Sequence, residues 1–141
     1  MDKPMQKSRE ILVQLLYAME ENGSFAGDFI NIFMSVFKVT RKNILEYVSL
    51  ALQIFEEKKE YDCYLGDISI EYSLDRIAKV DLAILRVILY ELKRDLIPIE
   101  VAVAEAIRIA KKFSSYGAGK YLHAMIDSIY KEMKCAAKSV C

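Results

Sequence analysis

Proline and glycine are scarce in this chain, which has two prolines and five glycines among its 141 residues. Both residue types interrupt helices, so their scarcity leaves long stretches free to be helical. Hydrophobic residues make up 54% of the chain, and a chain of this length buries a substantial core without disulfides or metals. No internal repeat, low-complexity tract or linker is present. These features predict one compact all-helical domain.

Several signals of other protein classes are also missing. No apolar run reaches the roughly 18 residues of a membrane span, and residues 1–10 are polar rather than a signal peptide. The cysteines are odd in number and widely spaced, and the chain has a single histidine. We therefore expect a soluble cytoplasmic protein with no metal site or other cofactor, and with reduced thiols at Cys63, Cys135 and Cys141.

An excess of charge of one sign is absent. The 20 basic residues match the 20 acidic residues, and the formal net charge is zero. Strong non-specific binding of nucleic acid depends on Lys and Arg displacing counterions, so this balance counts against it. A local basic face is still compatible with the composition.

The chain contains no catalytic motif. It has no glycine-rich phosphate loop, no nucleophile elbow and no pairing of Cys with His that spacing supports. The only histidine, His123, lies on an otherwise apolar predicted helix, and we interpret it as a packed or solvent-edge residue rather than a base. The sequence therefore predicts a protein that is not an enzyme.

The most apolar part of the chain is Leu82–Leu92, which only Arg86 and Glu91 interrupt. A helix that is apolar nearly all round is enclosed by protein, so this segment predicts the central helix of the core. Asp81 is in the position of its N-cap. A second buried helix is expected over residues 98–113, with the proline in its first turn.

Apolar residues at helical spacing predict further helices on both sides of this core. Ser8 is expected to cap the first helix, with Arg9 and Tyr17 near the surface and free to meet a partner. Thr40 is expected to cap a long third helix. The remaining expected helices cover residues 27–37, 61–78 and 118–133.

The second half of the chain carries a recognisable pattern, which reads LDRIAKVDLAILR…YEL…IP…VA…EAI…AKKF…GKY…D, and the chain opens with SREILVQLLYAMEE. This pattern resembles the NusB family of bacterial transcription antitermination factors, and the opening resembles the family's first helix. The chain departs at His123 and Ala124, where the family usually has Asn and Gly. The residues in register are Arg86, Glu91, Pro98, Glu105, Ala106, Lys111, Phe113 and Lys120.

The resemblance implies an all-α fold of six to seven helices in which two three-helix subdomains, about 8–61 and 62–135, pack together. Within such a fold, Glu105 is the natural partner of Arg86, and a buried ion pair would hold their two helices in register. Glu91 is a further structural charge.

The resemblance also implies binding of single-stranded boxA-type RNA by the basic N-terminus and by the corner between the last two helices. Cations contact phosphates and aromatic faces stack on bases in such complexes. Taken singly, each lysine is better explained as a solvated surface charge. The expected RNA-binding residues are Lys3, Lys7, Arg9, Lys111, Lys112, Phe113, Lys120 and Tyr121.

For protein binding, the resemblance implies docking of the ribosomal protein NusE across the first helix and the segment that leads into the central helix. Tyr17, Asp75 and Asp81 lie in these segments. Asp81 has a competing role as an N-cap, which is worth about 1 kcal/mol. Family members act in the RNA polymerase antitermination complex, in transcription antitermination and termination during ribosomal RNA synthesis, and some form homodimers.

Two other interpretations stay open. The zero net charge, the thin basic N-terminus and the altered segment 117–124 are compatible with a NusB-fold protein-interaction module whose RNA binding is weakened or lost. A NusB-like domain that serves an RNA methyltransferase is a third interpretation, and it would need a separate catalytic partner.

Overall fold

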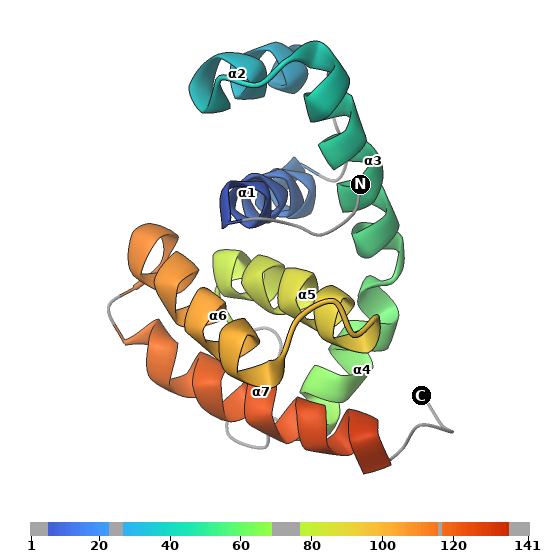
Figure 1. Ribbon diagram of the computed structural model, residues 1–141, viewed down its shortest axis with the longest axis vertical. Helices are drawn as coiled ribbons and strands as arrows, with labels where there is room; N and C mark the ends of the chain where they lie inside the picture. The colour runs from blue at the N-terminus through green and yellow to red at the C-terminus, as the bar shows by residue number, and fades with distance from the viewer. Residues whose placement is uncertain (1–5, 23–26, 69–76, 116, 136–141) are drawn as a thin grey trace.

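A computed structural model of the protein describes residues 6–22, 27–68, 77–115 and 117–135, and over these residues it contains α-helices and no strand (Figure 1). The predicted all-α fold is confirmed. The helices in the described part of the chain are α1 (Gln6–Asn22), α2 (Gly27–Phe37), α3 (Arg41–Glu56), α4 (Lys58–Ile68), α5 (Lys79–Lys93), α6 (Ile99–Phe113) and α7 (Ala118–Cys135).

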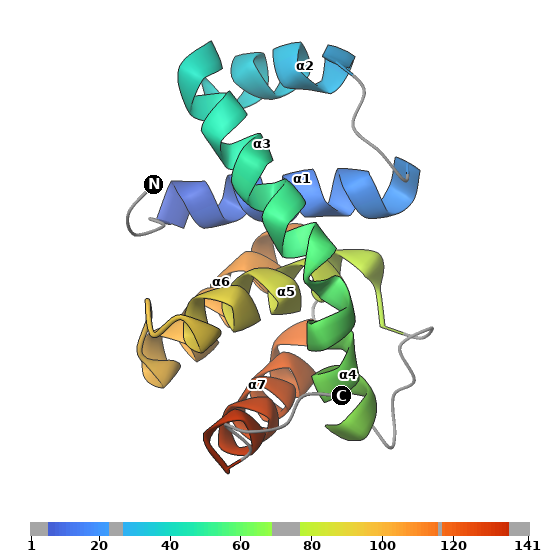
Figure 2. The ribbon, with the colours of Figure 1, turned by 90° about the vertical axis from the view of Figure 1, so that its right-hand side faces the viewer.

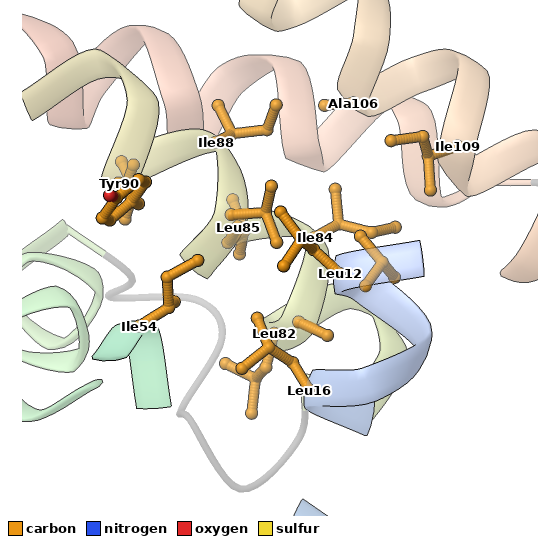
Figure 3. Packing of buried hydrophobic residues seen from close by; sticks show 14 of the residues in the cluster. Leu12, Leu16, Ile54, Leu82, Ile84, Leu85, Ile88, Tyr90, Ala106 and Ile109 are labelled. Atoms are coloured by element: carbon orange, nitrogen blue, oxygen red, sulfur yellow. The ribbon is translucent and has the colours of Figure 1, made fainter. Parts of the chain in front are cut away.

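Helix α5 is the centre of the core. It packs against α1, α6 and α7, and every residue from Asp81 to Leu92 is buried. Figure 3 shows Ile84, Leu85 and Ile88 of α5 among apolar side chains from α1 and α6. The central helix predicted from the sequence is confirmed, because only a helix covered on all sides buries so continuous a run.

Figure 2 shows α3 crossing α1 and continuing into α4 along one side of the molecule. Thr40 caps α3 as predicted, and its side-chain oxygen accepts a hydrogen bond of 3.2 Å from the backbone N–H of Asn43. The predicted cap at Ser8 is wrong, because α1 begins at Gln6. The Ser8 hydroxyl instead lies 2.9 Å from the hydroxyl of Tyr47 on α3.

Helix α4 begins three residues before the predicted helix 61–78 and ends at Ile68; residues 69–76 of that range lie outside the described residues. The early start has a tertiary cause, since the charged residues at the α3–α4 junction face the end of α5. Arg94 donates a 2.8 Å hydrogen bond to Glu57, and Lys93 is bonded to Glu60. Glu57 and Glu60, in the charged run of residues 56–60, thus belong to a contact between helices.

Cys63 of α4 is disulfide-bonded, so the expectation of three reduced thiols is wrong. The other two cysteines of the chain, Cys135 and Cys141, have no described side chains. Sequence spacing carried no signal for this bond, because a disulfide requires two Cβ atoms about 3.5–4.5 Å apart in the folded chain.

The buried charges of α5 pair differently from the prediction. Arg9 of α1, which is only 7% exposed, donates hydrogen bonds to Glu91 at 2.9 Å and to Glu105 at 2.8 Å. This arrangement joins α1, α5 and α6 through one guanidinium, whose planar fork suits two carboxylates. The predicted surface position of Arg9 is therefore wrong.

Arg86 does not pair with Glu105. It donates to Asp62 of α4 at 3.0 Å and lies 3.5 Å from Glu20 of α1. Arg86 and Glu91 are five positions apart on α5, which separates their directions by roughly 140° around the helix. Glu91 therefore faces Arg9 and Glu105, whereas Arg86 faces α4, and the predicted pair between Arg86 and Glu105 is wrong.

The substitution Arg9→Met tests the buried role of Arg9. It leaves the carboxylates of Glu91 and Glu105 enclosed without their shared cation, so we expect the free energy of unfolding to fall by about 3–5 kcal/mol. Urea denaturation measures this change. Lys7→Met, which alters an exposed residue of the same helix, is the matched control and should change the value by less than about 0.5 kcal/mol. Similar effects of the two substitutions would contradict the buried role.

Candidate functional site

Three exposed lysines gather where α6 ends and α7 begins. Lys111 and Lys112 are in the last turn of α6, where cations are favoured by the helix dipole, and Lys120 is in the first turn of α7. Helix α6 ends at Phe113 because Ser114 takes an extended backbone conformation. The corner between the last two helices therefore presents the lysines that the sequence predicts there.

These lysines line two hollows rather than one. Lys112 and Phe113 line a hollow of about 470 Å³ that α1 and α2 also border. Lys111 and Lys120 line another hollow, of about 860 Å³, between α6 and α7. The residues predicted to form a single RNA-binding surface at this corner are thus divided between two sides of α6.

Lys112 is paired with an acidic residue of α1. Glu10 accepts hydrogen bonds of 2.7 Å from Lys112 and 2.6 Å from Arg108. Partial burial of Glu10 disfavours its charged form, but these two hydrogen bonds prevail and lower the pKa of the carboxyl below its ordinary value. Lys112 therefore reaches the surface with its charge already offset.

Phe113 is partly buried at the edge of the core, and Lys112 lies 5.7 Å from the centre of its ring. Its ring borders the smaller hollow beside Phe33 and Phe37 of α2. The side chain thus packs against the core and also lines a surface hollow.

Tyr121 and Ser114 both donate hydrogen bonds to Asp81. The Ser114 hydroxyl is 2.5 Å from one carboxylate oxygen of Asp81, and the Tyr121 hydroxyl is bonded to the other. The tyrosine ring is half-buried. These bonds tie the start of α5 to the corner between α6 and α7, and they hold Tyr121 in place beside Lys120.

Asp81 does not have the N-cap role predicted for it. Helix α5 begins at Lys79, its cap residue is Ala78, and Asp81 lies inside the first turn. The carboxylate is 1% exposed, and burial raises its pKa above the ordinary value. Asp81 is therefore enclosed within the protein rather than presented to a partner, contrary to its predicted place on a protein-binding surface.

The N-terminal cations contribute less to the corner than predicted. Lys7 is exposed on α1, but Arg9 is held by Glu91 and Glu105 in the core. Lys3 lies outside the described residues. Of the three predicted N-terminal cations, Lys7 alone is described at the surface.

Comparison with known proteins decides the family. The sequence model described as the NusB family matches residues 6–131 of this chain. The chain belongs to the NusB family. The resemblance seen in its sequence pattern is thereby confirmed.

Relatives and a solved structure agree with this membership. The transcription antitermination protein NusB of Clostridium perfringens (strain SM101 / Type A) is 35% identical over 131 residues, which cover 91% of this chain and 97% of that protein. The protein of the same name from Acetivibrio thermocellus is 33% identical over 126 residues, 88% of this chain and 86% of its own. T. maritima NusB has a TM-score of 0.74 at 27% identity, with 94% of each chain covered. These similarities support a role in transcription antitermination.

The predicted protein-binding residues of this NusB-family chain are only partly described. Tyr17 lies on α1 and is 39% exposed, so its ring is accessible to a partner. Asp75 lies outside the described residues. The part of the predicted NusE-binding surface that can be located is therefore the exposed side of α1.

Sequence reasoning missed Glu10, which lines the smaller hollow, and its partner Arg108. Arg108 bonds Glu105 at 2.7 Å and also reaches Glu10, which links the buried ion pairs to the surface. In Figure 1 the end of α6 lies beside the start of α1. About one hundred residues separate Glu10 from Arg108 along the chain, so no spacing rule pairs them.

Within residues 6–22, 27–68, 77–115 and 117–135, no three His, Cys, Asp or Glu side chains are grouped as metal ligands would be. Over the same ranges, no helix combines the length and hydropathy that crossing a membrane requires.

The substitution Asp81→Ala tests the link between α5 and the corner. It leaves the hydroxyls of Ser114 and Tyr121 without their acceptor, so we expect a loss of about 1–3 kcal/mol in the free energy of unfolding. Urea denaturation measures it. Asp127→Ala removes an acidic residue whose partner is the exposed His123 and serves as the control, with little change expected. An unchanged stability of the Asp81 variant would contradict the link.

Proposed function

We propose that this NusB-family protein binds single-stranded boxA-type RNA together with the ribosomal protein NusE, and that it acts as a non-catalytic adaptor in the RNA polymerase antitermination complex. The observation that carries the RNA part is the placement of Lys111, Lys112 and Lys120, all exposed at one corner of the fold. The family membership supplies the antitermination context.

The corner has the chemistry that single-stranded RNA requires. Lysines at its surface are suited to phosphates, and each phosphate contact releases counterions from the RNA. The rings of Phe113 and Tyr121 are half-buried, which holds them rigidly enough to stack on bases. Lys7 of α1 is a further exposed cation that can extend the contact.

An adaptor of this kind gains affinity by binding two partners on one rigid body. Helix α1 presents Tyr17 to solvent, and the same helix is anchored to α5 and α6 by Arg9. If NusE docks on the exposed side of α1 while RNA occupies the corner, the two contacts reinforce each other through a high effective concentration. Asp81, being enclosed, has no part in this proposed docking.

Removing the corner lysines tests the proposal. We expect the triple variant Lys111→Ala, Lys112→Ala and Lys120→Ala to bind boxA RNA at least ten-fold more weakly. Its salt dependence should also be shallower, by about 0.7 in the log–log slope for each lost phosphate contact. Fluorescence anisotropy across a salt series, with and without NusE, measures both.

A triple variant at exposed lysines outside the corner, Lys42→Ala, Lys59→Ala and Lys131→Ala, removes the same charge and is the control. It should bind boxA RNA nearly as well as the wild type. Equal losses in the two triple variants would mean that only net charge matters, and the proposed surface would be wrong.

A second prediction concerns the acidic partner of Lys112. The substitution Glu10→Gln keeps the shape of the side chain but removes the carboxylate that pairs with Lys112, while Arg108 keeps its bond to Glu105. We therefore expect RNA to bind several-fold more tightly and with a steeper salt dependence. The same anisotropy assay measures it. Gln14→Glu, which adds a carboxylate one turn along α1 in the same hollow, should have the opposite effect. Unchanged affinity in both variants would exclude the smaller hollow from the RNA path.

A NusB-fold protein-interaction module with weakened RNA binding is the second candidate. The burial of Arg9 and the pairing of Lys112 with Glu10 favour it, because they reduce the cations free to meet phosphate. Binding of NusE by a wild-type protein that fails to bind boxA RNA, alone or in the complex, would select this candidate over the first.

A further inference from the structure

The larger hollow between α6 and α7 is lined by apolar, hydroxyl and imidazole side chains as well as by two of the corner lysines. Its α6 side is formed by Ile107, Lys111 and Ser114, and its α7 side by Gly119, Lys120 and His123. The volume of about 860 Å³ lies in the range of ligand pockets, about 300–1,000 Å³. Each helix contributes one lysine to the lining, and α7 also contributes the imidazole of His123.

His123 is an available ring rather than part of the core. Its side chain is 54% exposed, and Nε2 lies 3.4 Å from the Asp127 carboxylate one turn later on α7. The interpretation of His123 as a solvent-edge residue is thus confirmed. Its side chain also lines the larger hollow. An aromatic ring that is open on a rim and backed by a helix is the arrangement on which bases of single-stranded RNA stack.

Helices α6 and α7 approach closely beside the hollow. A Cβ atom built on Gly119 would lie 3.5 Å from Cγ2 of Ile107, so the missing side chain brings α7 close to α6 and leaves Ile107 between them. The hollow is thus lined by the apolar side chain of Ile107 from α6 and by the imidazole of His123 from α7. Phosphates, in contrast, are suited to the two lysines, which lie on opposite sides of the hollow.

We infer that the hollow of Lys111, Lys120 and His123 holds one unstacked base of single-stranded RNA against the imidazole of His123, with the flanking phosphates on the two lysines. This inference rests on the RNA binding proposed above. It adds a stacking residue to the proposed interface, and it assigns the base contact to His123 and the charge contacts to the lysines.

The first test uses the fact that the chain has one histidine. Its imidazole ¹H–¹³C signals can be followed by NMR without assignment while boxA-type RNA is added at constant pH. We expect them to shift saturably, at the same RNA concentration at which anisotropy reports binding. Inorganic phosphate alone should leave them nearly unchanged. Signals that stay unchanged while the protein binds RNA would overturn the inference.

The second test separates stacking from charge. His123→Ala should weaken RNA binding about five-fold or more, the range seen when a stacking aromatic is removed, with an unchanged salt slope. His123→Phe keeps a ring at the position and should retain most of the affinity. Lys111→Ala and Lys120→Ala should instead each lower the slope by about 0.7. Asp127→Asn removes the neighbour of His123 but not the ring, and should bind RNA at least as well as the wild type.

The outcomes distinguish this inference from the proposed function. Wild-type affinity in His123→Ala, with RNA binding otherwise intact, would overturn the base contact and leave the RNA-binding proposal standing. A fall in slope equal to that of a lysine variant would also overturn it, because it would make His123 a phosphate contact. A wild-type protein that binds no RNA, even with NusE, would overturn both.

Discussion

The contact of Arg9 with Glu91 and Glu105 is the constraint on which the arrangement of the three central helices depends. One guanidinium from α1 satisfies carboxylates from α5 and α6 that are 0% and 5% exposed. Two carboxylates enclosed this closely repel each other unless a cation lies between them, so α1 cannot shift along α5 without exposing that repulsion. The apolar core supplies the driving force for packing, and this ion pair fixes which helices meet.

The same interaction extends to the surface. Glu105 accepts from Arg108 as well as Arg9, Arg108 continues to Glu10, and Glu10 ends the network at Lys112. Partial burial of Glu105 disfavours its charged form, but hydrogen bonds from Arg108 and Arg9 prevail and lower the pKa of its carboxyl. Burial raises the pKa of Glu91, the other carboxyl that Arg9 contacts. The buried ion pairs are therefore connected to the charges at the corner.

The corner itself depends on a second buried carboxylate. Asp81 accepts from Ser114 and Tyr121 on the two sides of the turn between α6 and α7. The lysines on either side of this turn consequently lie on helices that are fixed relative to each other. A rigid corner means that the protein itself loses little conformational entropy when it binds a flexible single strand. This is the physical advantage of placing the proposed site on helices rather than on long loops.

The sequence by itself determined the helices and the central position of α5, because these follow from local periodicity and composition. The lysines at the corner followed from the resemblance to the family. It also carried the family pattern. Only the tertiary structure decided that Arg9 is buried and that Arg86 pairs with Asp62. It also decided that Asp81 accepts hydrogen bonds from the corner between α6 and α7 instead of capping α5. The reason is physical: partners such as Glu10 and Arg108 are distant in the chain, and a charged residue has the same local signature whether it meets water, a carboxylate or a ligand.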